Sequence, residues 1–320
     1  MGKLRIGVLR GGPSSEYDVS LLSGKTVLQN LSESRYDVKD IFIDKEGNWH
    51  MHGRAKEPGD ILQHLDVAFL ALHGEYGEDG KIQRLLDQFN IAYTGSGAYA
   101  STMSMHKAET KKILKDLDVK FAKHRILGVE TNIREELLDA IKTFAFPVIV
   151  KPARGGSSVG LSLVKTEEEL ADAVRKAFNV SPLVMIEEYI EGREATCGIV
   201  EDFRGEEVYA LFPVEIIPAH PDGVFDYEAK YSGESQEICP ARFSKDINDK
   251  LQKLAQDVHK EMGLRHYSRS DFMVTPEGIY FLEVNTLPGL TAESLLPKSI
   301  NAVGSSLVEF LDHIVTLARR

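Results

Sequence analysis

Long apolar runs are missing from this chain of 320 residues. The longest, such as VAFLAL and FPVIV, stop well short of the ~20 residues that a membrane-spanning helix needs. The opening MGKLRIGVLRGG has a strand-like apolar core and lacks the long apolar region and small-residue cleavage site of a signal peptide. These absences argue against a membrane protein and predict a cytoplasmic location.

Cysteine and positive charge are also scarce. Cys197 and Cys239 are the only cysteines and form no CxxC motif, so neither a zinc site nor a disulfide scaffold is indicated. We expect both to be core thiols in a reducing compartment. The chain has 38 Lys and Arg against 49 Asp and Glu, a net charge of −11. That balance disfavours a broad surface for nucleic acid or anionic membrane, which needs clustered basic side chains.

What the chain does contain is the composition of a globular protein, with 42% hydrophobic and 27% charged residues and a length that suits two or three domains. Strand and helix signals alternate over the first hundred residues: LRIGVL, SSEYDVSLLSGKTVLQNL, VAFLAL and KIQRLLDQF. Ser14 or Ser15 is the expected N-cap of the first helix. The alternation predicts a parallel, doubly wound sheet whose ligands lie at the carboxyl ends of the strands.

The pattern changes from about residue 101. A Lys-rich helix, KAETKKILKDL, precedes strands at FPVIVK and LSLVK. A helix should begin near Thr166 with a capping box to Glu169 and apolar positions 170, 173, 174 and 177. Further helices are expected over DINDKLQKLAQDVHKEM and at the chain end, where Ser306 and Glu309 form a second capping box.

A β-hairpin is predicted around TPEGI. Pro276 and Glu277 suit a type I turn, and Gly278 suits the left-handed residue of a three-residue loop with a G1 bulge. Thr275 would then face Ile279 across the hairpin. Counting outward from that pair gives the register of the two strands.

This register brings polar side chains of LEVNTLPG, residues 282–289, onto one face of the sheet. It places Asp271 opposite Glu283 and Arg269 opposite Asn285. Two carboxylates and an amide oxygen on one face suit Mg²⁺, which prefers oxygen ligands and accompanies nucleotide phosphates. The alternative is a solvated face whose charges pair with Arg269 and nearby lysines.

A second feature, FPVIVKPARGGSSVG, places Lys151 at the end of an apolar strand and follows it with a loop of small residues. Backbone N–H groups of such a loop can approach phosphate oxygens closely. Because LSLVK follows as another strand, the loop is a flap between strands; the GxxxxGK[ST] and GxGxxG motifs are absent. An ordinary flexible turn is the alternative. Together with the acidic hairpin, the loop makes ATP-dependent phosphoryl transfer plausible.

Several long motifs, in order along nearly the whole chain, resemble those of the D-alanine–D-alanine ligases of the ATP-grasp superfamily. They are GGPSSEYDVSLLSG, HGEYGEDGKIQ, YTGSG, VIVKPARGGSSVG, EEYIEGRE, DYEAKY, SRSDF and LEVNTLPGLTAESLLP. The resemblance implies a mixed α/β protein with the ATP-grasp fold. It would comprise a Rossmann-like N-terminal domain over residues 1–102, a central subdomain with the glycine flap over 103–186, and a C-terminal subdomain with the metal site over 187–320.

The resemblance also implies the reaction, in which one D-alanine carboxylate attacks the γ-phosphate of ATP and the amine of a second D-alanine displaces phosphate from the acyl phosphate. The dipeptide serves peptidoglycan synthesis. ATP and two Mg²⁺ or Mn²⁺ ions would be the cofactors, and a homodimer is expected from the family. A ligase that uses D-lactate or another acceptor is one alternative; a nucleotide-binding relative without turnover is another.

The family's site residues carry over to matching positions. The substrate-side set comprises Glu16, Ser157 and Tyr231 around the first D-alanine, Arg269 and the Gly289 N–H as oxyanion donors, Ser294 and Leu295 at the second carboxylate, and His73 near the first substrate. The nucleotide set is Lys107, Lys151, Ser158, Lys230, Glu187, Tyr189, Ile190 and Glu194, and the metal ligands are Asp271, Glu283 and Asn285. Helix-dipole stabilisation is an alternative role for Glu16.

Two finer expectations concern one segment. By the resemblance, an intact Tyr231 favours the dipeptide-forming version over relatives that use D-lactate. Because FDYEAKYSGES is rich in Gly and Ser beyond the tyrosine, we expect it to be a mobile lid over the nucleotide. His106 stands where the family often has Asp, which leaves the setting of Lys107 open.

Overall fold

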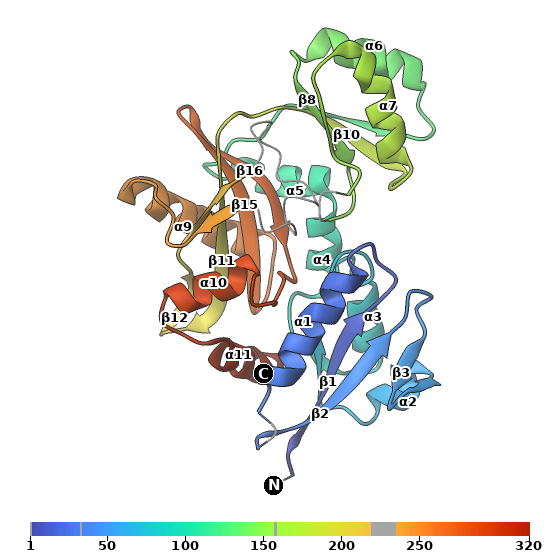
Figure 1. Cartoon of the computed structure of the whole chain (residues 1–320), viewed down its shortest axis with the longest axis vertical. Helices are drawn as coiled ribbons and strands as arrows, with labels where there is room; N and C mark the ends of the chain where they lie inside the picture. Colours follow the sequence, from blue (N-terminus) through green and yellow to red (C-terminus); the bar gives the residue numbers. More distant parts are fainter. Residues whose placement is uncertain (1, 33, 157–158, 219–234) are drawn as a thin grey trace.

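The computed structural model describes residues 2–32, 34–156, 159–218 and 235–320 and contains three β-sheets that follow one another along the chain (Figure 1). Ser157, Ser158, Lys230, Tyr231 and nearly all of the expected lid lie outside the described residues. Within the described ranges, every helix is too short or too polar to cross a membrane.

The first sheet has the strand order β4-β3-β2-β1-β5-β6. Strands β2, β1, β5 and β6 run parallel to one another, as the sequence predicts. Strands β3 and β4 are antiparallel and extend the sheet beyond β2. The elements are β1 (Leu4–Gly11), α1 (Tyr17–Asn30), β2 (Tyr36–Ile43), β3 (Trp49–Met51), β4 (Arg54–Lys56), α2 (Pro58–Leu62), β5 (Val67–Leu70), α3 (Lys81–Gln88) and β6 (Ala92–Tyr93).

Helix α1 begins later than predicted, with Glu16 as its N-cap in place of Ser14 or Ser15. The Ser14 hydroxyl accepts the Glu16 N–H at 3.1 Å, and the Ser14 carbonyl accepts the Tyr17 N–H at 3.2 Å. These bonds form a separate turn between β1 and the helix, so the helix starts only after it. The turn leaves Glu16 at the carboxyl end of β1.

The second sheet is antiparallel, with the order β7-β10-β8-β9, and helices lie along it in the upper part of Figure 1. Its elements are β7 (His124–Gly128), α6 (Ile133–Thr143), β8 (Val148–Pro152), β9 (Ser162–Val164), α7 (Glu167–Phe178) and β10 (Leu183–Glu188). Between the first two sheets the chain forms α4 (Ala98–Met105), α5 (Lys107–Ile113) and the 3-10 turn η1 (Leu114–Asp116). The pairing of β8 with β9 confirms that the glycine loop connects two strands.

Helix α7 buries the apolar positions that the sequence indicates: Leu170, Ala173, Val174 and Ala177. Its N-cap is Thr166, as predicted, but the capping box is not formed. Glu169 accepts the Lys165 N–H at 2.8 Å instead, one residue before the N-cap.

The third sheet has the order β14-β13-β11-β15-β16, with β12 paired to β11, and all its pairings are antiparallel. Its elements are β11 (Arg193–Phe203), β12 (Glu206–Ala210), β13 (Val214–Ile217), β14 (Gln236–Ile238), α9 (Lys245–Glu261), β15 (Tyr267–Thr275), β16 (Gly278–Asn285), α10 (Leu295–Ala302) and α11 (Leu307–Ala318). The predicted capping box of Ser306 and Glu309 is present at the start of α11.

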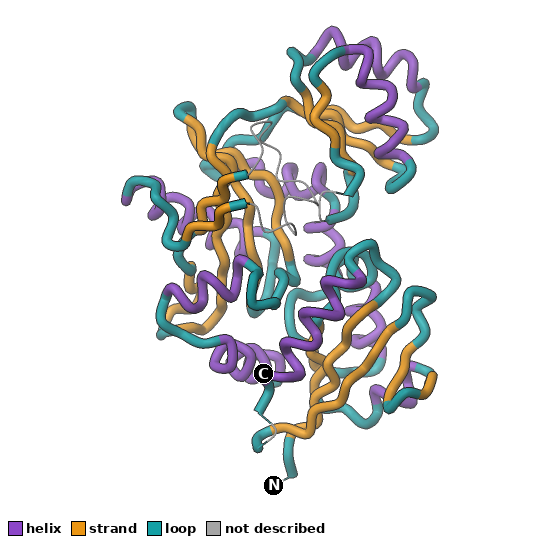
Figure 2. The backbone as a smooth tube through the Cα atoms, viewed as in Figure 1, coloured by secondary structure: helices purple, strands orange, loops and turns teal. Residues whose placement is uncertain are grey.

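The last helix returns to the first sheet, as the backbone trace shows near the C-terminus (Figure 2). Phe310 and Ile314 of α11 share one hydrophobic core with Ile6 and Leu70 of β1 and β5. The C-terminal helix therefore packs directly against the N-terminal sheet.

The two cysteines differ from the expectation that both are core thiols. Cys197 is fully buried in β11, and burial raises the pKa of its thiol. Cys239 is only partly buried beside the end of β14, so the expectation was wrong for that residue.

Candidate active site

The β15–β16 hairpin carries the metal-ligand candidates in the predicted register. Asp271 lies opposite Glu283, and Arg269 lies opposite Asn285. The predicted turn was wrong, because Thr275 pairs with Gly278 instead of Ile279.

A shorter turn and a bulge together produce that register. The Thr275 hydroxyl accepts the Glu277 N–H at 3.1 Å and donates to the Gly278 carbonyl at 3.0 Å, which closes a two-residue loop. The register then shifts between Asp271 and Phe272, where Leu282 is the extra residue of β16. A bulge of this kind re-aims the side chains that follow it.

Asp271 is buried, with 6% of its surface exposed, and its carboxylate accepts hydrogen bonds from three side chains. Arg269 binds both carboxylate oxygens at 2.8 Å, Asn285 Nδ2 donates to Oδ2 at 3.1 Å, and Thr196 Oγ1 donates to Oδ1 at 2.6 Å. Burial acts to lower the pKa of Arg269, but the Asp271 carboxylate outweighs it and the pKa is raised. The buried charges therefore form a hydrogen-bonded pair.

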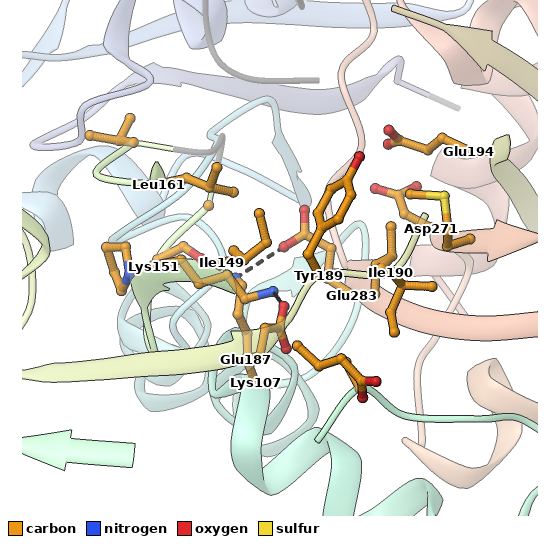
Figure 3. Close-up of a pocket in the computed structure, with 18 residues that line it drawn as sticks. Lys107, Ile149, Lys151, Leu161, Glu187, Tyr189, Ile190, Glu194, Asp271 and Glu283 are labelled. Atoms are coloured by element: carbon orange, nitrogen blue, oxygen red, sulfur yellow. Dashed lines mark hydrogen bonds and ion pairs between the residues drawn. The ribbon is translucent and has the colours of Figure 1, made fainter. Parts of the chain in front are cut away.

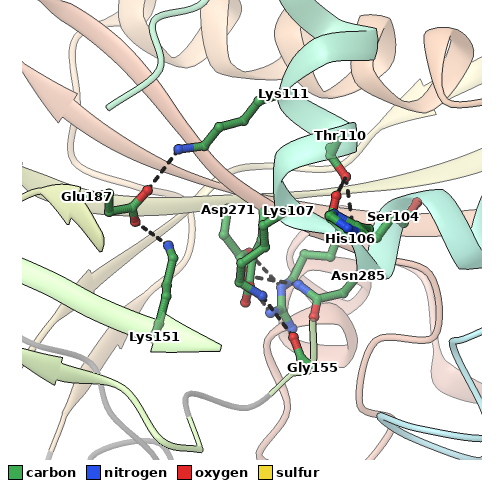
Figure 4. Close-up of polar contacts among 12 residues, drawn as sticks. Ser104, His106, Lys107, Thr110, Lys111, Lys151, Gly155, Glu187, Asp271 and Asn285 are labelled. Carbon is green, nitrogen blue, oxygen red and sulfur yellow. Dashed lines mark hydrogen bonds and ion pairs between the residues drawn. The ribbon is translucent and has the colours of Figure 1, made fainter. Parts of the chain in front are cut away.

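Glu283 pairs with a lysine from another part of the chain. Lys107 Nζ lies 3.0 Å from Glu283 Oε2. It also donates to the carbonyl oxygen of Gly155 at 2.8 Å (Figure 4). Lys107 thus connects the hairpin with the glycine loop at the start of α5. Its backbone N–H donates to the Ala153 carbonyl at 3.1 Å, which fixes its position. His106 lies between the two helices, as the C-cap of α4 and the N-cap of α5.

Asp271, Glu283 and Asn285 fit a divalent cation by their chemistry. Two carboxylates and one amide supply oxygen ligands on one sheet face, as Mg²⁺ or Mn²⁺ prefers. Among the described residues, no group of three or more His, Cys, Asp or Glu side chains is arranged to hold a metal. The candidate set has two carboxylates, Asp271 and Glu283, and the amide of Asn285. Arg269 pairs with Asp271 and Lys107 pairs with Glu283, which balances the negative charge of the two carboxylates.

A pocket lies between the second sheet and the hairpin (Figure 3). It gathers six predicted nucleotide residues, together with two of the three metal-ligand candidates: Lys107, Lys151, Glu187, Tyr189, Ile190, Glu194, Asp271 and Glu283. Its apolar lining includes Ile149, Leu161, Met273 and Leu282, which suits a flat aromatic ring. We name it the nucleotide pocket.

Glu187 lies at the base of the nucleotide pocket between two lysines. Its Oε1 pairs with Lys151 Nζ, and its Oε2 lies 2.8 Å from Lys111 Nζ (Figure 4). Burial acts to raise the pKa of Glu187, but Lys151 and Lys111 outweigh it and lower the pKa to about 2. The carboxylate is therefore held ionised, with both oxygens engaged.

A second pocket gathers the predicted substrate residues. Its lining includes Glu16, His73, Arg269, Asn285, Gly289, Ser294 and Leu295. Glu16 follows β1 and His73 follows β5, so both lie at carboxyl ends of neighbouring strands, as predicted for ligands of this sheet. We name it the substrate pocket.

The glycine loop reaches the substrate pocket as well. A Cβ atom added at Gly156 would lie 2.7 Å from Glu16 Oε1, closer than side-chain packing allows. The small residue at position 156 therefore permits close approach of the loop to Glu16. The same loop also lines the nucleotide pocket through Gly155 and Gly156.

His73 is buried, and both of its ring nitrogens have partners. Nδ1 lies 2.9 Å from the Leu287 carbonyl oxygen, and Nε2 lies 2.7 Å from the Ser23 hydroxyl. Burial lowers the pKa of His73 to about 4. The neutral ring therefore donates from Nδ1 and accepts at Nε2, and it binds the 286–290 segment while lining the pocket.

Two family models match the chain: the D-ala D-ala ligase N-terminus over residues 5–63 and 51–96, and the D-ala D-ala ligase C-terminus over residues 113–316. A D-alanine--D-alanine ligase of Geotalea uraniireducens (strain Rf4) is 39% identical over 318 residues, which cover 98% of this chain and 95% of that protein. D-alanine--D-alanine ligase B of Clostridium perfringens (strain 13 / Type A) is 36% identical, with 98% and 97% covered. The chain belongs to the D-alanine–D-alanine ligase family.

Solved structures confirm the ATP-grasp fold of this D-alanine–D-alanine ligase family member. VanG D-Ala:D-Ser ligase from Enterococcus faecalis gives a TM-score of 0.86 at 28% identity and covers 99% of this chain and 100% of that chain. D-alanyl-alanine synthetase A from Vibrio cholerae gives 0.85 at 30% identity, with 100% of both chains covered. The mixed α/β architecture predicted from the sequence is thus correct.

Two residues at the candidate site, Lys111 and Glu78, were not predicted from the sequence. Lys111 is buried against Glu187, and its spacing of four residues from Lys107 on a helix was the signal that could have found it. Glu78 accepts N–H groups from the 286–290 segment and lines the substrate pocket. These two N–H groups belong to the backbone of a distant segment, for which the sequence carries no signal.

Proposed function

We propose that this chain joins two D-alanines to D-alanyl-D-alanine, with cleavage of ATP to ADP and phosphate, for peptidoglycan precursor synthesis. The observation that supports this most strongly is that the two pockets adjoin on one hairpin. Asp271 and Glu283 line the nucleotide pocket, while Arg269 and Asn285 line the substrate pocket. A γ-phosphate at the hairpin and a carboxylate in the substrate pocket would be neighbours.

The first step requires a D-alanine carboxylate oxygen to attack the γ-phosphorus. Glu16 would bind that substrate's ammonium group, with Ser157 and Tyr231 in the same network. Lys107, Lys151 and Lys230 would neutralise phosphate oxygens, with Ser158 of the glycine loop. Lys107 already lies between the loop and Glu283, which supports its role. The step forms a P–O bond to the carboxylate and releases ADP.

The second step requires the amine of another D-alanine to attack the acyl carbon. Ser294 and Leu295 would hold its carboxylate at the start of α10, and both line the substrate pocket. Arg269 and the Gly289 N–H would stabilise the oxyanion of the tetrahedral intermediate. Collapse of that intermediate forms the peptide bond and expels phosphate, which carries away one oxygen of the first carboxylate.

The remaining site roles extend this proposal. Glu187, Tyr189 and Ile190 would contact adenine, and Glu194 the ribose. Asp271, Glu283 and Asn285 would hold two Mg²⁺ or Mn²⁺ ions, which when bound withdraw negative charge from the phosphates. A domain division at residues 102 and 186 and a homodimer are parts of the proposal that come from the family. The cytoplasmic location is proposed from the sequence.

Isotope transfer tests the acyl-phosphate route. D-Alanine labelled with ¹⁸O in its carboxylate is incubated with ATP and Mg²⁺, and the released phosphate is analysed by mass spectrometry. One ¹⁸O atom per phosphate is expected because the attacking oxygen leaves with phosphorus. Unlabelled phosphate would show that water attacks ATP directly and would refute the proposal.

A different acceptor is the second candidate, and the likeness to a D-Ala:D-Ser ligase structure favours considering it. D-Lactate would attack through a hydroxyl in place of the amine. D-Serine keeps the amine and adds a hydroxyl to the side chain. Equal concentrations of D-alanine, D-serine and D-lactate in one reaction, with ATP, would reveal the preference. A predominance of D-alanyl-D-alanine supports the leading proposal, and a predominance of a mixed product supports the second.

A further inference from the structure

Residues 286–290, which follow β16, are held through their backbone by three side chains of the N-terminal region. These side chains are Ser23, His73 and Glu78. Glu78 Oε1 accepts the N–H of Thr286 at 3.0 Å and that of Leu287 at 2.9 Å. The other oxygen of Glu78 accepts the Gly74 N–H at 2.9 Å, which anchors the carboxylate to its own loop. All three distances are those of well-formed N–H···O hydrogen bonds.

The other two contacts lie on the same segment. His73 Nδ1 binds the Leu287 carbonyl at 2.9 Å, and the Ser23 hydroxyl accepts the Leu290 N–H at 3.2 Å. Ser23 and His73 also bind each other at 2.7 Å, so the two act as one unit. Ser23 is fully buried and His73 is 3% exposed, so water does not compete with these bonds.

These contacts leave one backbone donor of the segment available. Thr286, Leu287 and Leu290 donate their N–H groups to Glu78 and Ser23, and Pro288 has none. Within the described ranges, the Gly289 N–H donates to no protein acceptor. Gly289 lines the substrate pocket, where that donor can meet a ligand.

We propose that Glu78 is a positioning residue that, together with the His73–Ser23 pair, fixes the 286–290 segment so that the Gly289 N–H is aimed into the substrate pocket. This inference rests on the proposed function for the role of that donor. A preorganised N–H stabilises a developing oxyanion only if it need not move during the reaction. All three side chains belong to the N-terminal region. This region would therefore set the position of the oxyanion donor without supplying a donor itself.

Glu78→Ala tests the proposal because it removes the acceptor of three backbone N–H groups at once. We expect hydrogen exchange at the 286–290 amides to become at least ~10-fold faster and kcat to fall roughly 10- to 100-fold, as for other supporting residues of active sites. The KM for ATP should stay within about twofold, because Glu78 does not line the nucleotide pocket. Glu78→Gln, which keeps one acceptor oxygen, should recover part of kcat.

Glu75→Gln is the matched control, since Glu75 is an exposed acid of the same loop. It should leave kcat and hydrogen exchange unchanged. If Glu78→Ala does not fold, Ser23→Ala loosens the same segment at Leu290 and replaces it in the test. Thermal unfolding of each variant establishes that activity is measured on folded protein.

Two outcomes would overturn the proposal. One is faster exchange with kcat within about twofold of the wild type, because placement of the segment would then not matter for turnover. The other is a fall in kcat with unchanged exchange, because Glu78 would then act by another route. Exchange is read without turnover, so a wild-type enzyme that made no dipeptide would refute the proposed function separately.

Discussion

Asp271 lies opposite Glu283 although the turn of their hairpin is one residue shorter than the sequence predicts. The bulge at Leu282 compensates for the short turn. Without it, Leu282 would face Asp271 and Glu283 would point to the other side of the sheet, because side chains alternate along a strand. The bulge therefore brings the two carboxylates together, as often occurs beside active sites.

Glu283→Gln should reduce kcat by roughly 100-fold or more, because loss of a metal carboxylate removes several kcal/mol of transition-state stabilisation. The side chain is partly exposed and keeps its shape, so the thermal unfolding midpoint should change little. Steady-state phosphate release measures the effect. Glu277→Gln, at the exposed turn of the same hairpin, is the control, and full activity of Glu283→Gln would refute the metal assignment.

Gly156→Ala should raise the KM for D-alanine, because the added Cβ would lie 2.7 Å from Glu16 Oε1 and displace the carboxylate. A hydrogen bond to a charged group contributes about 1.5–3 kcal/mol, so kcat/KM should fall roughly 10- to 100-fold. Initial rates across D-alanine concentrations provide the measurement. Gly128→Ala, which meets only an ordinary contact with Leu183 at 3.6 Å, is the control. Unchanged kcat/KM in Gly156→Ala would count against the role of Glu16.

Lys111→Met should raise the KM for ATP roughly tenfold with little change in kcat. Lys111 fixes one oxygen of Glu187, and its loss frees that carboxylate to rotate away from the nucleotide. Lys112→Met is the matched control, because Lys112 is exposed and pairs with Glu109. ATP saturation curves distinguish the two variants. Equal KM values for Lys111→Met and the wild type would contradict a nucleotide-positioning role.

The free energy of unfolding should fall as the pH drops from 7 to 5. Burial lowers the pKa of His73 to about 4, and burial together with Arg265 lowers that of His266 to about 4. The unfolded chain binds protons near pH 6.5 and the folded chain does not, so this stability is present above pH 6.5 and is lost toward pH 4. Each of the two histidines should lower the free energy of unfolding at pH 5 by roughly 2 kcal/mol.

Urea unfolding at pH 7 and pH 5 measures this loss. In His73→Gln the decrease between the two pH values should be smaller by roughly 2 kcal/mol, because one titrating group is absent. An equal decrease in the variant and the wild type would show that His73 is not held neutral in the folded protein.

The sequence predicted those parts of the site that depend on local patterns. Counting outward from the expected turn placed Asp271 and Glu283 on one face, and apolar spacing identified the buried face of α7. The turn at Thr275 was predicted wrongly because several loop lengths suit the same residues. The predicted pairing of Asp271 with Glu283 is nevertheless correct, because the bulge at Leu282 adds the residue that the shorter turn lacks.

Contacts between distant segments were not predictable in the same way. Glu78 was visible only as one acid of HGEYGEDG, while its partners are backbone N–H groups of residues 286 and 287. Every residue has such groups, so they leave no mark on composition or spacing. The charge pairing of Lys111 likewise depends on how α5 packs on the second sheet. Family resemblance supplied the substrate roles of Ser294 and Leu295, which residue chemistry alone did not indicate.

The most direct test of the proposed activity is the stoichiometry of one reaction. Purified protein is incubated with ATP, Mg²⁺ and D-alanine, and ADP and D-alanyl-D-alanine are quantified by mass spectrometry. The account predicts one dipeptide per ADP and neither product when D-alanine is replaced by L-alanine. ADP without dipeptide, or no ADP at all, would contradict it.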